Sequence, residues 1–398
     1  MNKLPVGVIR LRSSLSINDK KLQSLCDAFL SKCNKDGRLE FVKPSKDIMN
    51  VFFVQTGGSE IYFKDAYTSF PEPYFILARK ENNSLAASME IVSFLQAQKK
   101  QAFLIFGDEE EVGRSLLRYA QFVEAKKALS SMRLGIIGKP SDWLIASDVD
   151  PVALKKKWGI NLVQVPYKRF IAEIEKNDID DDPKILSIQK KSRRKEDMRF
   201  SLAIHKALKN ICKQYKLDGF TLRCFDLVKK YQQTACLGFS LLNDDLLVAG
   251  CEGDVPAMLS MVFSKVLLGQ PAFMANPAFF DKAKKKAIYA HCTVPLSMCG
   301  DYHFDTHFES DHGIGVAGAM EKKPVTCFKI KPDLTAIRAK SGQIIDTPSN
   351  KNMCRTQIEV RFDDDIDEMI SHPYGNHMIF IYGDHKEELE QFFAFLEA

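Results

Sequence analysis

The alternation of apolar runs with amphipathic helical stretches over the first 131 residues constrains the fold more than any other feature of this sequence. The runs PVGVIRL, NVFFVQ, YFILAR and AFLIFG have the composition of β-strands, and helical patterns separate most of them. Such alternation predicts parallel βαβ units. Asn83 or Ser84 can cap the helix after YFILAR, and Asp108 with three glutamates gives the next helix start a charge favourable to its dipole.

A second α/β domain is predicted to begin near residue 132, where RLGIIG reads as a strand and turn. The pattern continues through NLVQVP, one long basic helical region (IQKKSRRKEDMRFSLAIHKALKNICKQY) and GFTLRCF. The stretch LLVAGCEGDVPAMLSMVFSKV then indicates a strand, a short loop and a helix. That loop puts Glu252 and Asp254 at the C-terminal end of a strand, where open α/β sheets usually bind ligands.

After about residue 276 the sequence changes to short β runs, KAIYAHCTV, PVTCFKI, TQIEVRF and HMIFIYG, separated by turns that contain Gly and Asp. One closing helix follows from about residue 385. This texture predicts a mostly antiparallel, barrel-like domain. We therefore expect three domains: two Rossmann-like parallel-sheet domains over 1–131 and 132–275, the second carrying Glu252, and a mostly β domain over 276–398 that carries His377.

Charge and composition argue against several classes of protein. The 56 basic and 51 acidic residues nearly balance, and acidic residues follow the basic run KKSRRKED without interleaved aromatics, so we expect a solvated helix face and no nucleic-acid site. The sequence contains no run of about 18 apolar residues, so no membrane span is predicted. The N-terminus lacks the apolar core of a signal peptide, and the ten Cys form no C-x-x-C pair. These features favour free thiols in a cytoplasmic protein.

Three glycine-containing turns, TGGSE, GIIGKPS and HGIGVAG, invite a nucleotide-binding interpretation. The last matches G-x-G-x-x-G letter for letter, but β-type sequence lies on both sides of it, whereas the dinucleotide fingerprint needs a strand before and a helix after. The turn GKPS could still bind an anionic or hydroxyl-bearing group at a helix start. A nicotinamide or nucleotide enzyme is therefore the least favoured of the functions considered.

Candidate metal ligands occur in three separate segments: Glu252 in CEGD, His291 in AHCTVP and His377 in GNHMIFIYG. Each also has a structural interpretation, as a helix-capping carboxylate or a hydrogen-bonded core histidine. Seven of the eight His follow residue 290, and YHFDTHFESDHG, at 302–313, is dense in His, Asp and Glu. That stretch is either part of a site or a polar loop whose side chains satisfy one another.

The segments GCEGDVPAMLSMVFSKVLLGQPAFMANP, AHCTVP and PYGNHMIFIYGDHKEELEQF resemble the L-fucose isomerase and L-arabinose isomerase superfamily. The likeness covers roughly the last 150 residues, and RLGIIGKPSDWLIAS also looks like a segment of smaller fucose-isomerase-like proteins. The resemblance implies an aldose–ketose isomerase, an intramolecular oxidoreductase of carbohydrate metabolism. Such an enzyme uses a divalent cation, typically Mn²⁺, and moves a proton between C1 and C2 of an open-chain sugar through an enediol whose oxygens the metal holds.

Carried over by position, the resemblance implies that Glu252 is both a metal ligand and an acid/base group, and that His377 is an imidazole ligand. His291 lies where arabinose-isomerase relatives have a further ligand. The family's second acid/base carboxylate falls on Asn276 in FMANP, which is a departure. An amide oxygen can coordinate a hard cation, but it cannot accept and return a proton near neutral pH.

Two explanations remain open for Asn276. Either another residue supplies the missing base, or the protein is a carbohydrate-binding member of the fold that lacks catalysis or has altered chemistry. The candidates for the base, which would also line the sugar site, are Asp254, Asp305, His307 and Glu309. Family members are usually trimers or hexamers with shared active sites, so the resemblance implies a homo-oligomer in which Trp143 and the NNS turn at 82–84 contact the sugar from a neighbour. A buried anchor and a helix cap are the structural alternatives for these two features.

Overall fold

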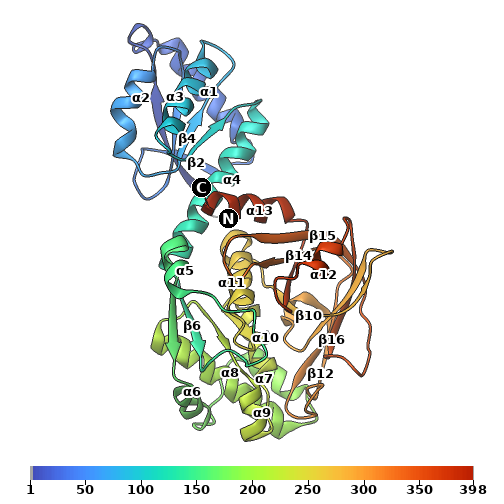
Figure 1. Cartoon of the computed structure of the whole chain (residues 1–398). Coiled ribbons are helices and arrows are strands. Elements are labelled where there is room, and N and C mark those ends of the chain that lie inside the picture. Colours follow the sequence, from blue (N-terminus) through green and yellow to red (C-terminus); the bar gives the residue numbers. More distant parts are fainter. Residues whose placement is uncertain (1–2, 398) are drawn as a thin grey trace. The chain divides into compact units, whose positions relative to one another are not determined.

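The computed structural model describes residues 3–397 and divides the chain into two compact units (Figure 1). The first unit ends at Lys127, and the second spans Ala128–Glu397. The boundary falls within the long helix α4 (Glu109–Ser131). The central and C-terminal parts of the chain thus belong to one compact unit, which holds both the second parallel sheet and the β domain.

The first unit is built on a five-stranded, wholly parallel sheet in the order β2-β1-β3-β4-β5, as the alternating pattern predicts. All six residues of β3 are buried, because a central strand of such a sheet is covered on both faces. Strand β2 has no counterpart among the predicted runs. The strands are β1 (Leu4–Leu11), β2 (Leu39–Val42), β3 (Met49–Val54), β4 (Tyr74–Leu77) and β5 (Ala102–Ile105), and the helices before α4 are α1 (Lys20–Cys33), α2 (Glu60–Ala66) and α3 (Ser84–Ala97).

The helix starts of this unit follow the sequence at α4 and depart from it at α3. The Asp108 carboxylate accepts hydrogen bonds from two backbone N–H groups of the first turn of α4, at 3.0 and 2.9 Å. At α3, Asn83 adopts a left-handed conformation (φ 55°) and its side chain makes no capping bond. Ser84 is buried, accepts a hydrogen bond from the Arg79 N–H at 3.0 Å and donates to the Val54 carbonyl. The predicted side-chain cap is therefore wrong, because Ser84 instead ties the helix start to the sheet.

The second unit begins with a four-stranded parallel sheet in the order β7-β6-β8-β9. From β6 the chain first adds β7 on one side and then β8 and β9 on the other, so the strand order reverses between β6 and β8. At such a point open α/β sheets leave a crevice at the carboxyl ends of their strands. The elements are β6 (Arg133–Ile137), α5 (Pro151–Trp158), β7 (Asn161–Val165), α6 (Tyr167–Ile174), α7 (Pro183–Lys190), α8 (Lys195–Tyr215), β8 (Gly219–Leu222), α9 (Phe225–Tyr231), α10 (Cys236–Asp244), β9 (Val248–Cys251) and α11 (Val255–Phe263).

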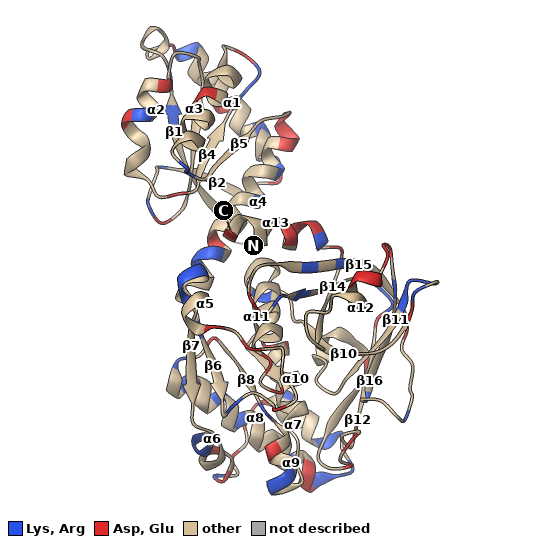
Figure 2. Ribbon diagram, in the orientation of Figure 1, with Lys and Arg blue, Asp and Glu red and all other residues tan. Residues whose placement is uncertain are grey.

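The basic region predicted as one helix forms two, α7 and α8, with an interruption between them. The Ser192 hydroxyl accepts a hydrogen bond from the backbone N–H of Arg194 at 3.1 Å, a local bond that competes with helix continuation. Basic and acidic residues are interspersed over both units (Figure 2), and Arg194 pairs with Asp197 at 2.6 Å. The basic run therefore lies on helices whose charges are partly paired.

The rest of the second unit is a closed antiparallel barrel of six strands in the order β10-β11-β16-β15-β14-β17, which confirms the predicted barrel-like domain. Apolar side chains fill it, and the rings of Tyr289 and Phe380 pack edge-on 4.6 Å apart. The strands are β10 (Phe273–Asp281), β11 (Lys286–His291), β14 (Pro324–Ile330), β15 (Ile337–Asp346), β16 (Thr356–Phe362) and β17 (Met378–Tyr382); a separate pair, β12 (Cys299–Asp305) and β13 (Gly315–Met320), and the helices α12 (Asp367–Ser371) and α13 (Lys386–Glu397) complete the unit.

Helix α11 is the element that joins the sheet to the barrel. All nine of its residues are buried, and it contacts β8 and β9 of the sheet as well as β14 and β17 of the barrel. All ten cysteines are free thiols. Across residues 3–397, no helix combines the length and the apolar character needed to cross a lipid bilayer.

Candidate metal centre

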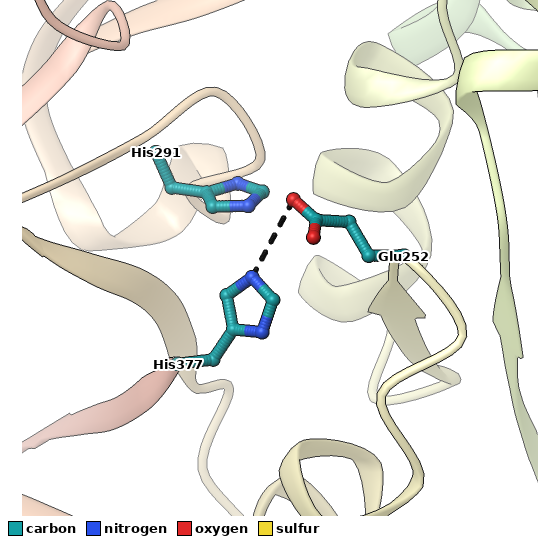
Figure 3. A group of neighbouring side chains, drawn as sticks. All are labelled: Glu252, His291 and His377. Carbon is teal, nitrogen blue, oxygen red and sulfur yellow. Dashed lines mark ion pairs between the residues drawn. The ribbon is translucent and has the colours of Figure 1, made fainter. Parts of the chain in front are cut away.

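Three buried side chains, Glu252, His291 and His377, converge at the junction between the second parallel sheet and the barrel (Figure 3). Each offers one potential ligand atom, and these atoms all lie within 4.8 Å of one another. Glu252 follows β9, His291 ends β11, and His377 directly precedes β17. The sheet thus supplies the carboxylate and the barrel supplies two imidazoles.

The loop that carries Glu252 has an unusual backbone. Glu252 and Gly253 both have left-handed conformations, with φ of 63° and 79°. A Cβ on Gly253 would lie 2.5 Å from the Cα of Pro140, so only glycine fits against the loop that follows β6. The backbone N–H of Ser141 donates to the Glu252 carbonyl at 2.9 Å. The two loops are therefore locked together at the crevice of the sheet.

The Glu252 carboxylate is held by neighbours on both of its oxygens. Trp143 Nε1 donates a hydrogen bond to Oε2 at 2.7 Å, and His377 Nε2 lies 3.5 Å from Oε1. Burial alone would raise the pKa of Glu252, but the neighbouring His377, together with His291 and Trp143, lowers it to about 2. The carboxylate is consequently ionised at neutral pH and available to a cation.

Trp143 lies beside Glu252 of its own chain, which corrects the expectation that it approaches the site from a neighbouring copy. Its side chain is no buried anchor either, since it is 46% exposed. The indole packs edge-on against Phe225 with ring centroids 5.0 Å apart. One end of the ring thus fixes the carboxylate while part of its surface remains accessible.

His377 is oriented by a chain of fully buried charged groups. Its Nδ1 lies 2.8 Å from Asp254 Oδ2, and Lys329 Nζ lies 3.1 Å from the same oxygen, with no exposed surface on any of the three side chains. Asp254 Oδ1 also accepts the backbone N–H of Ala257 at 2.7 Å, which caps α11. A carboxylate on one imidazole nitrogen is the usual support of a metal-binding histidine.

The remaining nitrogen of His377 points at the shared space. Burial would lower the pKa of His377, but the hydrogen bond to Asp254 and the charges of Asp254 and Glu252 outweigh it and raise the pKa. Within residues 3–397, Nε2 is buried and has no hydrogen-bond partner. A buried polar atom without a partner is costly, so its position next to a carboxylate and a second imidazole fits a metal ligand.

His291 completes the donor set as a neutral imidazole. Its Nδ1 lies 2.9 Å from Thr293 Oγ1, and its ring centroid lies 5.7 Å from that of His377. Burial and the neighbouring His377 lower the pKa of His291 to about 3, against the opposite effect of Glu252. One carboxylate and two imidazoles are ligands that many divalent transition metals accept, so this group could hold a metal ion.

Asn276 lies on the strand between those that carry the two histidines. On β10, Asn276 pairs with Ala290, the residue before His291, and the preceding residue pairs with Met378, the residue after His377. Asn276 Oδ1 accepts a hydrogen bond from the Asn376 side chain at 3.2 Å. The strand register thus brings Asn276 to the same end of the barrel as both imidazoles.

The four other predicted side chains occupy different surroundings. Asp254 is fully buried with both oxygens engaged, which makes it the partner of His377 rather than a group that contacts a sugar. Asp305 bonds the backbone of Thr306 and, together with residues of β12, β13 and the segment before β16, lines a separate cavity of about 230 Å³. His307 is buried, whereas Glu309 is exposed, and partial burial and the charge of Glu252 raise the pKa of Glu309.

Two contributors escaped the sequence analysis. Lys329 lies in the run PVTCFKI, where a lysine inside an apolar strand was the available signal of a buried charge pair. Phe225 follows β8 and reaches the crevice because the carboxyl ends of β6, β8 and β9 share one edge of the sheet. Its position could have been predicted only from the strand order.

Comparison with known proteins gives relatives of low identity that share one name. No protein-family model matches the chain. The chain is 22% identical over 331 residues to a sulfoquinovose isomerase of Priestia megaterium, which covers 77% of this chain and 73% of the relative. It is 29% identical over 199 residues to that of Clostridium sp. MSTE9 (47% and 44%), and 19% identical over 338 residues to that of Alkalicoccus urumqiensis (79% and 74%). The chain is thus similar to sugar isomerases over most of its length.

Proposed function

We propose that this protein is a metal-dependent aldose–ketose isomerase, related to the L-fucose and L-arabinose isomerases, with Mn²⁺ as its cation. The observation that supports it is the convergence of Glu252, His291 and His377 at the crevice of the sheet, in a chain similar to sugar isomerases. Glu252, His291 and His377 would hold the ion, with the Asn276 amide oxygen as a neutral fourth ligand. When bound, a divalent cation polarises the oxygens on the two reacting carbons of the sugar.

The residues of the chain then have separate tasks. Glu252, kept ionised by its neighbours, exchanges a proton with the sugar carbons, taking it from C2 and returning it to C1. Trp143 fixes the Glu252 carboxylate and offers its accessible ring to the sugar. Asp254 and Lys329 hold the His377 ring in one orientation. The cation and the sugar would therefore meet groups that are already positioned.

The substrate is an open-chain aldose, and a sulfonated hexose belongs among the first sugars to test because the relatives are named sulfoquinovose isomerases. We further propose a cytoplasmic homo-oligomer, a trimer or hexamer, whose sites are completed by neighbouring chains. A second function, carbohydrate binding without turnover, is favoured by one observation: an amide, Asn276, stands where the related enzymes carry a proton-exchanging carboxylate.

The test incubates the protein with Mn²⁺ and a panel of pentoses, hexoses, 6-deoxy sugars and sulfoquinovose in D₂O. NMR then follows formation of the ketose and exchange of the C2 proton. We expect both with one sugar class, and we expect Glu252→Gln to abolish both. Glu359→Gln, which alters a partly exposed ion pair with Lys286 on the barrel, is the matched control and should keep full activity. Sugar binding without exchange would instead support the binding function.

A further inference from the structure

Aldose–ketose isomerisation moves two protons, one between carbons and one between oxygens, and within residues 3–397 the candidate metal centre offers one carboxylate, Glu252, for this work. Glu252 can serve the carbons. Asp254 is occupied by Lys329, His377 and the start of α11, and the Asn276 amide cannot exchange a proton near neutral pH. The oxygen-bound proton therefore needs a group from outside the donor set.

His307 approaches the centre from the segment between β12 and β13. Its ring packs edge-on against Phe225 with centroids 5.6 Å apart, and Phe225 packs in turn on Trp143, whose Nε1 donates to Glu252. The negative charge of Glu252 acts on the pKa of His307, and protonation of His307 would lower the pKa of His291. His307 is thus an electrostatic neighbour of two members of the donor set without belonging to it.

The surroundings of His307 fix its ring and leave one nitrogen unoccupied. The side chain is buried, Nδ1 lies 3.2 Å from Ser310 Oγ, and the backbone bonds to His312 at 3.0 Å and to Asp311 at 2.9 Å. Among residues 3–397, Nε2 of His307 has no hydrogen-bond partner. Unlike the fully buried unpartnered atoms, it keeps some contact with solvent. A rigid imidazole with one accessible nitrogen is suited to proton transfer.

The protonation state agrees with this geometry. Burial and the charge of Arg355 lower the pKa of His307, although Glu252 acts in the opposite direction, so the ring is neutral at neutral pH. Glu309 is the other candidate near Glu252, but its side chain is exposed. Among the described residues, Ser310 bonds to the His307 ring and no side-chain hydrogen bond fixes Glu309. His307 is therefore the better-placed group.

We propose that His307 Nε2 is the second proton-transfer group of this site, an inference that rests on the proposed function. Glu252 carries the proton from C2 to C1, while His307 takes the hydroxyl proton from O2 and delivers it to O1. The C1 carbonyl becomes a hydroxyl-bearing CH₂ group and C2 becomes the carbonyl. Both side chains end in their starting states, so no further reactant is consumed.

The test compares His307→Gln and His307→Ala with the wild-type protein on the sugar that it turns over. We expect kcat to fall by roughly 10²–10⁴-fold, the usual contribution of a proton-transfer group, with little change in KM. Mn²⁺ affinity, measured by electron paramagnetic resonance titration, should stay unchanged. Added imidazole should restore part of the His307→Ala rate in proportion to its concentration, a rescue that a purely structural role would not give.

A matched control makes the outcome decisive. His303→Gln changes an exposed histidine of the same segment and should leave kcat unchanged. Wild-type kcat in His307→Gln, or loss of Mn²⁺ binding together with activity, would overturn this inference alone. A wild-type protein that turns over no sugar would overturn the proposed function as well.

Discussion

At the scale of single residues, Lys329 and Asp254 form an ion pair that is completely buried. Both side chains have no exposed surface, and burial lowers the pKa of Lys329 while the charge of Asp254 opposes that shift. Two buried charges stabilise a fold only when each keeps its partner. The pair is retained here because Asp254 also orients His377 and caps α11.

We predict that Lys329→Met lowers the free energy of unfolding by about 3–5 kcal/mol, because the buried Asp254 carboxylate loses its lysine and keeps only His377 and the Ala257 N–H as partners. Urea unfolding at pH 7 measures the loss. The double variant Lys329→Met/Asp254→Asn should recover most of it, since both charges are then removed. Lys331→Met, which breaks the exposed pair with Asp333 in the same part of the chain, should change nothing measurable. Equal effects of the two lysine variants would contradict this account.

His205 gives a pH-dependent prediction. It is buried in α8, and burial, helped by Lys209 and opposed by Asp180, lowers its pKa to about 4. The unfolded chain binds this proton near pH 6.5, so the unfolded state holds more protons between the two values. The stability due to a neutral His205 is therefore complete above about pH 6.5 and falls by about 3 kcal/mol as the pH drops to about 4. His205→Met should flatten this part of the profile of urea midpoint against pH.

At the scale of elements, the loop after β9 determines where the Glu252 carboxylate lies. We predict that Gly253→Ala weakens Mn²⁺ binding by at least about tenfold, because a Cβ there would meet the Pro140 backbone and push Glu252 out of register with the histidines. Gly269→Ala is the matched control: its φ of 63° is also left-handed, but no atom lies within 4 Å of the added Cβ. The control should lose some stability, about 1 kcal/mol, and keep its metal affinity.

The elements also show how far sequence reasoning reaches. Alternating strand and helix patterns predict both parallel sheets except for β2, because the period of apolar residues is local information. The position of Glu252 followed from the end of β9, since carboxyl ends of parallel strands share an edge. His291 and His377 stood out only as separate candidates, and their shared site was implied by a resemblance, because the closure that brings β11 and β17 next to β10 depends on strand register. The bond between Lys329 and Asp254 spans 75 residues, so the lysine in the apolar run PVTCFKI indicates a buried charge but not its partner.

At the scale of the whole molecule, the surface of the first unit bears on assembly. Four large apolar side chains there are more than half exposed, and they lie in segments that follow the carboxyl ends of its strands: Leu15, Ile17, Ile61 and Met89. Exposed apolar side chains of this size favour a protein–protein contact where they lie together on one surface. They support the proposed homo-oligomer.

We predict that light scattering after size-exclusion chromatography gives a mass of three or six chains. If neighbouring chains complete each site, activity per chain should fall when dilution dissociates the oligomer, and Mn²⁺ binding by the isolated chain should survive, since Glu252, His291 and His377 come from one chain. A fully active monomer would contradict the shared site while leaving the isomerase proposal intact.

The donor set is divided between a loop of the sheet and two strands of the barrel. This division makes the stability of the second unit depend on the supply of metal. A cation held by Glu252 and the two histidines would link the parallel sheet of the second unit to its barrel, and the link would be lost when the cation dissociates. Its binding energy would add to the stability of that unit in proportion to the logarithm of free metal. In cells short of the metal, the protein would first lose its activity. The less stable metal-free protein would then be degraded faster by proteases.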